Sequence, residues 1–174
     1  MKYRRIIISL MISLFAILAA ANVSAEPAAA STLKQLDGKS ASIADYTGKG
    51  KWLVVMLWAS DCQVCNREAS TYEKFHEQHK DKDAQLLGVS LDGQPNLKDA
   101  EDFIKRHGIK FPNLIDSAQN VADMYLKLTG DEWVGTPTFM VYNPKGELLG
   151  AQVGAVPVTI IEDFIKRESK TSAM

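Results

Sequence analysis

The chain contains little cysteine and no excess of basic charge. Its 174 residues include two cysteines, and 20 Lys and Arg are balanced by 21 Asp and Glu, for a formal net charge of −1. A disulfide framework needs more cysteines, and a nucleic-acid-binding surface needs a basic patch. The sequence also has no internal repeat and no set of ligands at zinc-finger spacing. The composition therefore favours an ordinary globular domain that depends on its hydrophobic core.

Residues 1–25 have the features of an export signal. Three basic side chains precede an apolar stretch at 6–21, and residues 23–25 form a small-residue cleavage site. The stretch is short for a membrane span, which needs about 20 residues, so we predict cleavage, with a retained anchor as the alternative. No cysteine lies there to carry a lipid. The folded part is therefore expected in the periplasm, where disulfides persist.

The rest of the chain reads as one domain behind a short linker. Residues 26–31 are rich in Ala and Pro, and residues 32–170 fit a single domain of typical size. Cleavage after residue 25 would leave 17 basic against 21 acidic side chains. A domain of this length buries a core without covalent staples.

The two cysteines are three positions apart, as Cys62 and Cys65. An apolar run at 52–58 leads into them, and an amphipathic stretch at 67–79 follows, so we expect a strand that delivers the pair to a helix N-terminus capped by Ser60 or Asp61. The free N–H groups and the dipole of such a helix lower the pKa of a thiol. Because a bridge across so short a loop stabilises little, about 2 kcal/mol, a dithiol/disulfide switch is the favoured interpretation.

The remaining pattern alternates strands and helices. Further strands are expected at 32–36, 40–43, 84–91, 111–115, 138–142 and 147–153, and further helices at 97–107, 121–128 and 158–167. The segments 32–36 and 40–43 flank Asp37-Gly38, a hairpin turn signal. The predicted fold class is α/β, a mixed central sheet with helices on both faces.

These features resemble the thioredoxin fold and, within it, the TlpA/ResA-like branch of exported thiol–disulfide oxidoreductases. The resemblance runs from about residue 32 to 167. It is carried by the hairpin at 36–39, by Trp58-Ala59-Ser60, by Cys62-Gln63-Val64-Cys65 and by Gly135-Thr136-Pro137-Thr138, together with Gly108-Ile109-Lys110-Phe111-Pro112 and Asp116.

The resemblance implies roles for several residues. Pro137 would be a cis-proline that faces the cysteines and, with Thr136, would present the main chain to a substrate strand. Trp58 is expected in the core and as a wall of the active site. Trp133 is a candidate for a substrate groove, with an ordinary surface aromatic as the alternative. These residues, with Asp61 beside Cys62, form the predicted substrate-binding set.

Two departures from the family concern acidic residues. Asp61 replaces the aromatic residue that the family usually has before the first cysteine, and its carboxylate should oppose thiolate formation. The buried aspartate of cytosolic thioredoxins is replaced by Met56, and Asp92, after the strand at 84–91, is the nearest candidate for an acid. A solvated turn aspartate is the alternative for Asp92.

The expected function is a thiol–disulfide oxidoreductase that reduces protein disulfides, with Cys62 as nucleophile and Cys65 as resolving thiol. The resemblance implies a membrane thiol transporter as electron donor, and we expect no cofactor, no resident metal and no nucleic acid.

Three alternatives remain at this point. Two thiolates could carry Cu(I), and the same pair could form disulfides instead of reducing them. A thiol peroxidase would share the fold, but the proline of its cysteine motif is missing ahead of Cys62.

Overall fold

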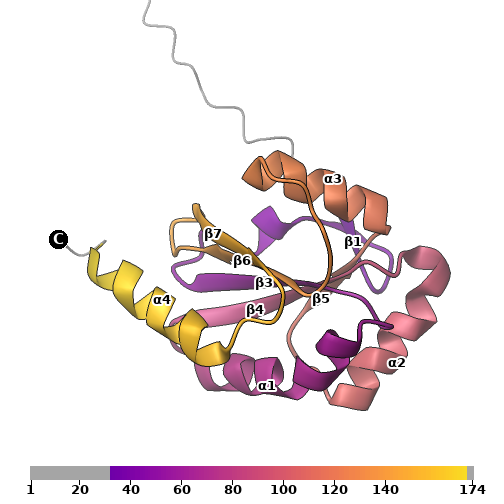
Figure 1. Cartoon of the computed structure of the whole chain (residues 1–174), viewed down its shortest axis with the longest axis horizontal. Helices are drawn as coiled ribbons and strands as arrows, with labels where there is room; N and C mark the ends of the chain where they lie inside the picture. The colour runs from indigo at the N-terminus through magenta and orange to yellow at the C-terminus, as the bar shows by residue number, and fades with distance from the viewer. Residues whose placement is uncertain (1–31, 172–174) are drawn as a thin grey trace, which may run out of the picture.

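The computed structural model describes residues 32–171. The predicted export signal at 1–25 and the linker at 26–31 lie outside the described residues. The described part is an α/β structure built on one seven-stranded sheet (Figure 1). Its strands are β1 Leu33–Gln35, β2 Ser40–Ala41, β3 Trp52–Trp58, β4 Ala84–Ser90, β5 Asn113–Ile115, β6 Thr138–Tyr142 and β7 Leu148–Val153.

The sheet is mixed, with the strand order β2-β1-β5-β4-β3-β6-β7. The three inner strands β3, β4 and β5 are parallel, while β1, β2, β6 and β7 pair antiparallel with their neighbours. Parallel strands need helices as crossover connections, which explains the alternation of strands and helices that the sequence pattern predicted.

Four helices cover both faces of this sheet. They are α1 Gln63–His79, α2 Leu97–His107, α3 Ala118–Thr129 and α4 Val158–Thr171, with short 3-10 turns at Ile43–Asp45 and Gln94–Asn96. Figure 1 shows α3 on one face of the sheet and α1, α2 and α4 on the other. None of the helices in the described part of the chain combines the length and the apolar content needed to cross a membrane.

Strand β3 is buried along its whole length because it separates two cores. Its even-numbered side chains, such as Val54 and Met56, pack with α1, α2 and α4. Its odd-numbered side chains, such as Leu53 and Val55, pack with α3 and the 3-10 turn after β2. A strand covered on both faces reads as a continuous apolar run, and the run at 52–58 was correctly predicted as such a strand.

The structure corrects the predicted start of α1. The helix begins at Gln63, four residues before the predicted start, and its N-cap is Cys62 instead of Ser60 or Asp61. The Cys62 sulfur accepts a hydrogen bond from the main-chain N–H of Cys65, at 3.1 Å. A sulfur therefore takes the capping role that Ser, Asp or Asn oxygens usually have.

Candidate active site

Strand register brings three segments together at one edge of the sheet. Trp58, the last residue of β3, pairs with Ser90, the last residue of β4. Because β6 runs antiparallel to β3, its first residue, Thr138, lies opposite Leu57 at the same edge. The loop before Cys62, the segment after β4 and the segment before β6 therefore meet at the carboxyl ends of the parallel strands, where α/β sheets usually bind ligands.

Cys62 and Cys65 are joined by a disulfide at this edge, with their Cα atoms 5.2 Å apart. Cys65 lies on the first turn of α1 and is completely buried, whereas Cys62 is partly exposed. Only Cys62 can therefore be approached by a large partner. Once reduced, its sulfur would lie beside the N–H groups of a helix N-terminus, the environment that stabilises a thiolate.

The segment before β6 contains a cis peptide bond between Thr136 and Pro137, the isomer that the family resemblance implies. The Pro137 carbonyl accepts a hydrogen bond from the Gly154 N–H at 2.8 Å, and the Thr138 hydroxyl donates to the Gly135 carbonyl. Among the described residues, the main-chain N–H and C=O of Thr136 have no hydrogen-bond partner. This segment therefore presents one unpaired peptide donor and one acceptor at the site.

Asp92 is bonded to the loop that carries Cys62. Its carboxylate accepts hydrogen bonds from the Ser60 N–H at 3.1 Å, from the Ser60 hydroxyl at 2.8 Å and from the Ser90 hydroxyl at 2.7 Å. Asp92 is partly buried, and these bonds join the end of β4 to the loop after β3.

The structure places Trp58 in the core, as expected, and corrects its assignment to the substrate-binding set. This side chain is 1 % exposed, stacks on Phe103 with ring centroids 4.3 Å apart, and donates its indole N–H to Asn113 at 3.0 Å. It is a core residue beneath the site and offers no surface for substrate contact. Hydrophobic and aromatic residues are the usual core formers. The residue type of Trp58 alone could therefore not distinguish a core role from a role in substrate contact.

The other predicted substrate-binding residues lie at the surface or close to it. Asp61 is exposed beside Cys62, and Trp133 is partly buried with an indole N–H that has no partner among the described residues. Val134, which the sequence analysis missed, is the more exposed neighbour, with 74 % of its surface accessible. A single exposed apolar residue gives no distinctive sequence signal.

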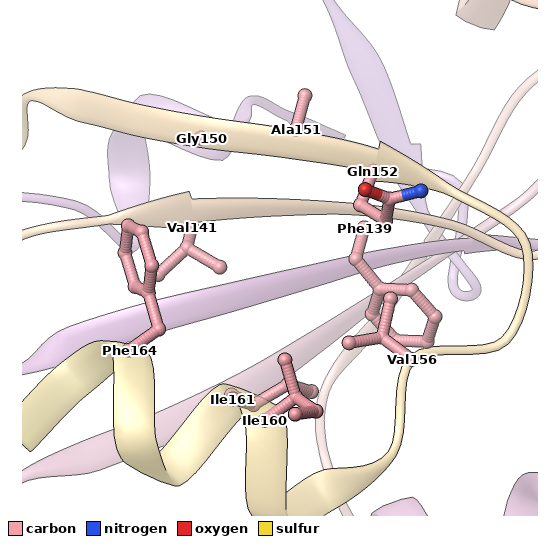
Figure 2. A pocket seen from close by; sticks show the side chains of 9 residues that line it. All are labelled: Phe139, Val141, Gly150, Ala151, Gln152, Val156, Ile160, Ile161 and Phe164. Atoms are coloured by element: carbon pink, nitrogen blue, oxygen red, sulfur yellow. The ribbon is translucent and has the colours of Figure 1, made fainter.

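An apolar groove lies beside the edge strand β7, between β6, β7 and α4 (Figure 2). Phe139, Gln152 and Val156 line one end, and Val141 and Phe164 line the other (Figure 2). The groove has no titratable or metal-ligating side chain. Within residues 32–171, moreover, no cluster of three or more His, Cys, Asp or Glu side chains could hold a metal ion.

Fold and site together define a class: a thioredoxin-like thiol–disulfide oxidoreductase with a cysteine pair at a helix N-terminus. The chain belongs to the AhpC/TSA family, whose family model matches residues 25–150. Its relatives include the thiol-disulfide oxidoreductases ResA of Geobacillus kaustophilus, 32 % identical over 77 % of this chain and 71 % of that protein, and ResA of Halalkalibacterium halodurans, 29 % identical over 77 % and 70 %. The crystal structure of StoA from Bacillus subtilis is 25 % identical, with a TM-score of 0.58 over 76 % of this chain and 92 % of StoA.

Proposed function

We propose that the protein is an extracytoplasmic reductant of protein disulfides that cycles Cys62 and Cys65 between dithiol and disulfide. The observation that carries this proposal is the asymmetry of the pair. Cys62 is partly exposed at the helix N-terminus, whereas Cys65 is buried behind it. This is the arrangement that a nucleophile and a resolving thiol require.

The reaction follows from this asymmetry. The Cys62 thiolate attacks one sulfur of a substrate disulfide, the substrate S–S bond breaks, and one substrate thiolate leaves. The Cys65 thiolate then attacks Cys62 in the mixed disulfide, and the second substrate thiolate leaves. The substrate gains two electrons, and the protein ends in the Cys62–Cys65 disulfide form, which is the form described above.

The neighbouring segments suggest how a polypeptide substrate would be held. The unpaired main-chain groups of Thr136 could pair with an extended substrate strand next to Pro137. Asp61 directly precedes Cys62 in the sequence, and Trp133 lies three residues before Thr136. We assign both side chains to substrate contact. Asp92 is the candidate acid, since it is the carboxylate bonded to the Cys62 loop.

Export and electron supply complete the proposal. We assign residues 1–25 to an export signal and 26–31 to a linker, ahead of the domain at 32–170. One solved structural neighbour is described as an exposed lipoprotein thioredoxin of Streptococcus pneumoniae, which supports a location outside the cytoplasm. Each turnover consumes two electrons, so a membrane thiol transporter is the donor we propose for the periplasm. The protein would touch the membrane permanently only if the signal were retained.

The direct test is reduction of insulin by the purified chain with dithiothreitol as electron source. We expect activity that survives metal chelation and is lost in Cys62→Ser. Cys65→Ser should instead accumulate a mixed disulfide, because no thiol remains to release the substrate. Activity that persists in Cys62→Ser would contradict the proposal.

A redox titration against glutathione tests the direction of transfer. A midpoint below about −200 mV supports a reductant, whereas one near −120 mV indicates an oxidant.

A further inference from the structure

Asn66, one turn into α1, is a polar hub that the sequence analysis did not identify. Its side-chain Nδ2 donates to the carbonyls of Ser60 and Cys62, each at 2.9 Å. Its Oδ1 accepts from Arg106 and from His107, each at 3.0 Å. Carbonyl oxygens only accept and a guanidinium only donates, so these partners allow one orientation of the amide. All the hydrogen-bonding capacity of Asn66 is thus used.

The two carbonyls that accept from Asn66 Nδ2 belong to the loop that carries Cys62, the partly exposed cysteine. Ser60 is held on both sides, because Asp92 accepts from its N–H while Asn66 donates to its C=O. The Cys62 carbonyl receives a second bond, from the Asn66 main-chain N–H at 3.0 Å. The loop that delivers Cys62 is therefore bonded both to the end of β4 and to α1.

The partners on Oδ1 come from the end of a different helix. Arg106 and His107 are the last two residues of α2, 40 and 41 positions away from Asn66 in the sequence. Burial, reinforced by the Arg106 charge, lowers the pKa of His107, so the neutral ring donates through Nε2. A charged donor on Oδ1 polarises the amide and strengthens its N–H bonds on the other side.

We propose that Asn66 is a positioning residue for the dithiol–disulfide cycle, which holds the Cys62 peptide over the first turn of α1 and ties it to α2. The inference rests on the proposed function above. Carbonyl oxygens carry the negative end of the peptide dipole and disfavour a nearby thiolate. The Asn66 amide directs two N–H groups at the Ser60 and Cys62 carbonyls, and it keeps the Cys62 sulfur in line with the Cys65 N–H, 3.1 Å away.

The test is the alkylation rate of the reduced full chain by iodoacetamide as a function of pH. Because Cys65 is fully buried, the rate reports the thiolate fraction of Cys62. In Asn66→Ala we expect the pKa of Cys62 to rise by about 0.5 to 1 unit. Alkylation and insulin reduction at neutral pH should slow by about threefold to tenfold, and the redox midpoint should become more negative.

Asn143→Ala is the matched control. Asn143 is also an asparagine hub, buried at the β6–β7 turn, where Oδ1 accepts from the N–H groups of Lys145 and Glu147 and Nδ2 donates to the Glu147 carboxylate. Its loss should lower stability and leave the Cys62 titration unchanged. If Asn66→Ala likewise lowers stability alone, with an unchanged Cys62 pKa and midpoint, Asn66 is only a structural brace and the inference is overturned.

A second variant covers the case in which Asn66→Ala does not fold. Asn66→Asp keeps the acceptor for Arg106 and His107 and removes both N–H donors, so the same slowing is expected. Gln63→Glu is the charge control, because it adds the same negative charge at an exposed position of the first turn and leaves the hydrogen bonds to the two carbonyls intact. It should slow alkylation less than Asn66→Asp does. Equal effects would overturn the inference. If Cys62→Ser abolishes insulin reduction while both Asn66 variants behave like the wild type, the inference about Asn66 fails and the proposed function stands.

Discussion

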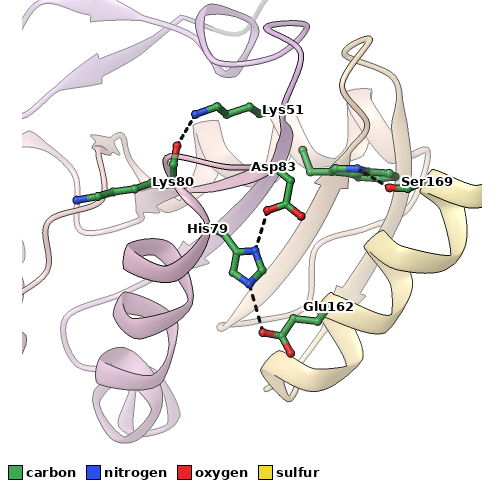
Figure 3. Close-up of polar contacts among 7 residues, drawn as sticks. Lys51, His79, Lys80, Asp83, Glu162 and Ser169 are labelled. Carbon is green, nitrogen blue, oxygen red and sulfur yellow. Dashed lines mark hydrogen bonds and ion pairs between the residues drawn. The ribbon is translucent and has the colours of Figure 1, made fainter.

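The two ends of α1 carry polar clusters of different kinds. At the N-terminal end, Asn66 and Asp92 bond to main-chain groups of the loop that carries Cys62. At the C-terminal end, the imidazole of His79 lies between the carboxylates of Asp83, at 2.9 Å, and Glu162, at 3.3 Å (Figure 3). The first cluster fixes a peptide in place, whereas the second joins side chains that water can also solvate.

Exposure explains why the two clusters should differ in energy. The side chains of Asp83 and Glu162 are 57 % and 38 % exposed, and exposed ion pairs contribute little to stability. Ser90, which donates to Asp92, is completely buried. A buried donor that loses its acceptor costs its full desolvation energy. Variants should therefore lose most stability where they break buried hydrogen bonds at the cysteine end, and least at the exposed His79 cluster.

The largest effect is expected at the cysteine end, in Asp92→Ala. This change leaves the Ser60 N–H and the Ser90 hydroxyl without their acceptor. We expect the free energy of unfolding of the oxidised protein to fall by about 2 kcal/mol, measured by urea titration. Asp99→Ala, which removes an exposed carboxylate from the first turn of α2, is the control and should change stability little.

Equal losses in Asp92→Ala and Asp99→Ala would mean that the bonds of Asp92 to Ser60 and Ser90 contribute no more stability than an exposed carboxylate does. Asp92→Asn separates the anchoring role from the proposed acid role, because the amide oxygen can still accept from Ser60 but the group no longer titrates. If Asp92 acts as an acid, the pH profile of insulin reduction changes in Asp92→Asn while stability changes less than in Asp92→Ala.

An intermediate effect is expected at His76, which lies in the last turn of α1 but is buried. This residue is 6 % exposed, and its Nδ1 accepts from the Leu86 N–H at 3.1 Å. Burial lowers the pKa of His76, so the ring stays neutral in the folded state under conditions where the unfolded chain takes up a proton. Stability is therefore fully present above the ordinary histidine pKa of about 6.5 and falls as the pH drops below it.

The variant that tests this is His76→Gln, compared with the wild type by urea unfolding between about pH 7.5 and about pH 5.5. We expect the wild type to lose stability on acidification and His76→Gln to lose less. His107→Gln is the control, because the pKa of His107 is lowered in the same direction but its ring is less buried. An identical pH slope in the wild type and in His76→Gln would show that His76 is not the group that takes up the proton.

Much of this arrangement could be predicted from sequence, for identifiable reasons. The apolar run at 52–58 and the helix at 97–107 were predicted with the observed bounds, because a doubly buried strand and a Gly-terminated amphipathic helix have strong patterns. The start of α1 was missed, since residues 63–66 have no apolar periodicity and a sulfur is an unusual cap.

The polar part of the site was less accessible to sequence reasoning. Asp92 was found because it follows a predicted strand, but its bonds to Ser60 depend on strand register. The role of Asn66 depends on the approach of Arg106 and His107 from a separate helix. Local patterns contain no information on such contacts. A spacing of four from Cys62 was the one available signal, because it places a side-chain donor near the preceding turn.

The smallest effect is expected at the last turn of α1, in a double-mutant cycle of His79→Gln and Glu162→Gln. The coupling energy between the two side chains should stay below about 1 kcal/mol and decrease further with added salt, because both groups contact solvent. The Lys98–Asp102 pair on α2, with side chains 80 % and 53 % exposed, is the reference for an exposed helical pair, with an expected coupling of about 0.3 to 0.5 kcal/mol. A His79–Glu162 coupling as large as the loss in Asp92→Ala, and insensitive to salt, would mean that both ends of α1 are fixed equally and that exposure does not distinguish them.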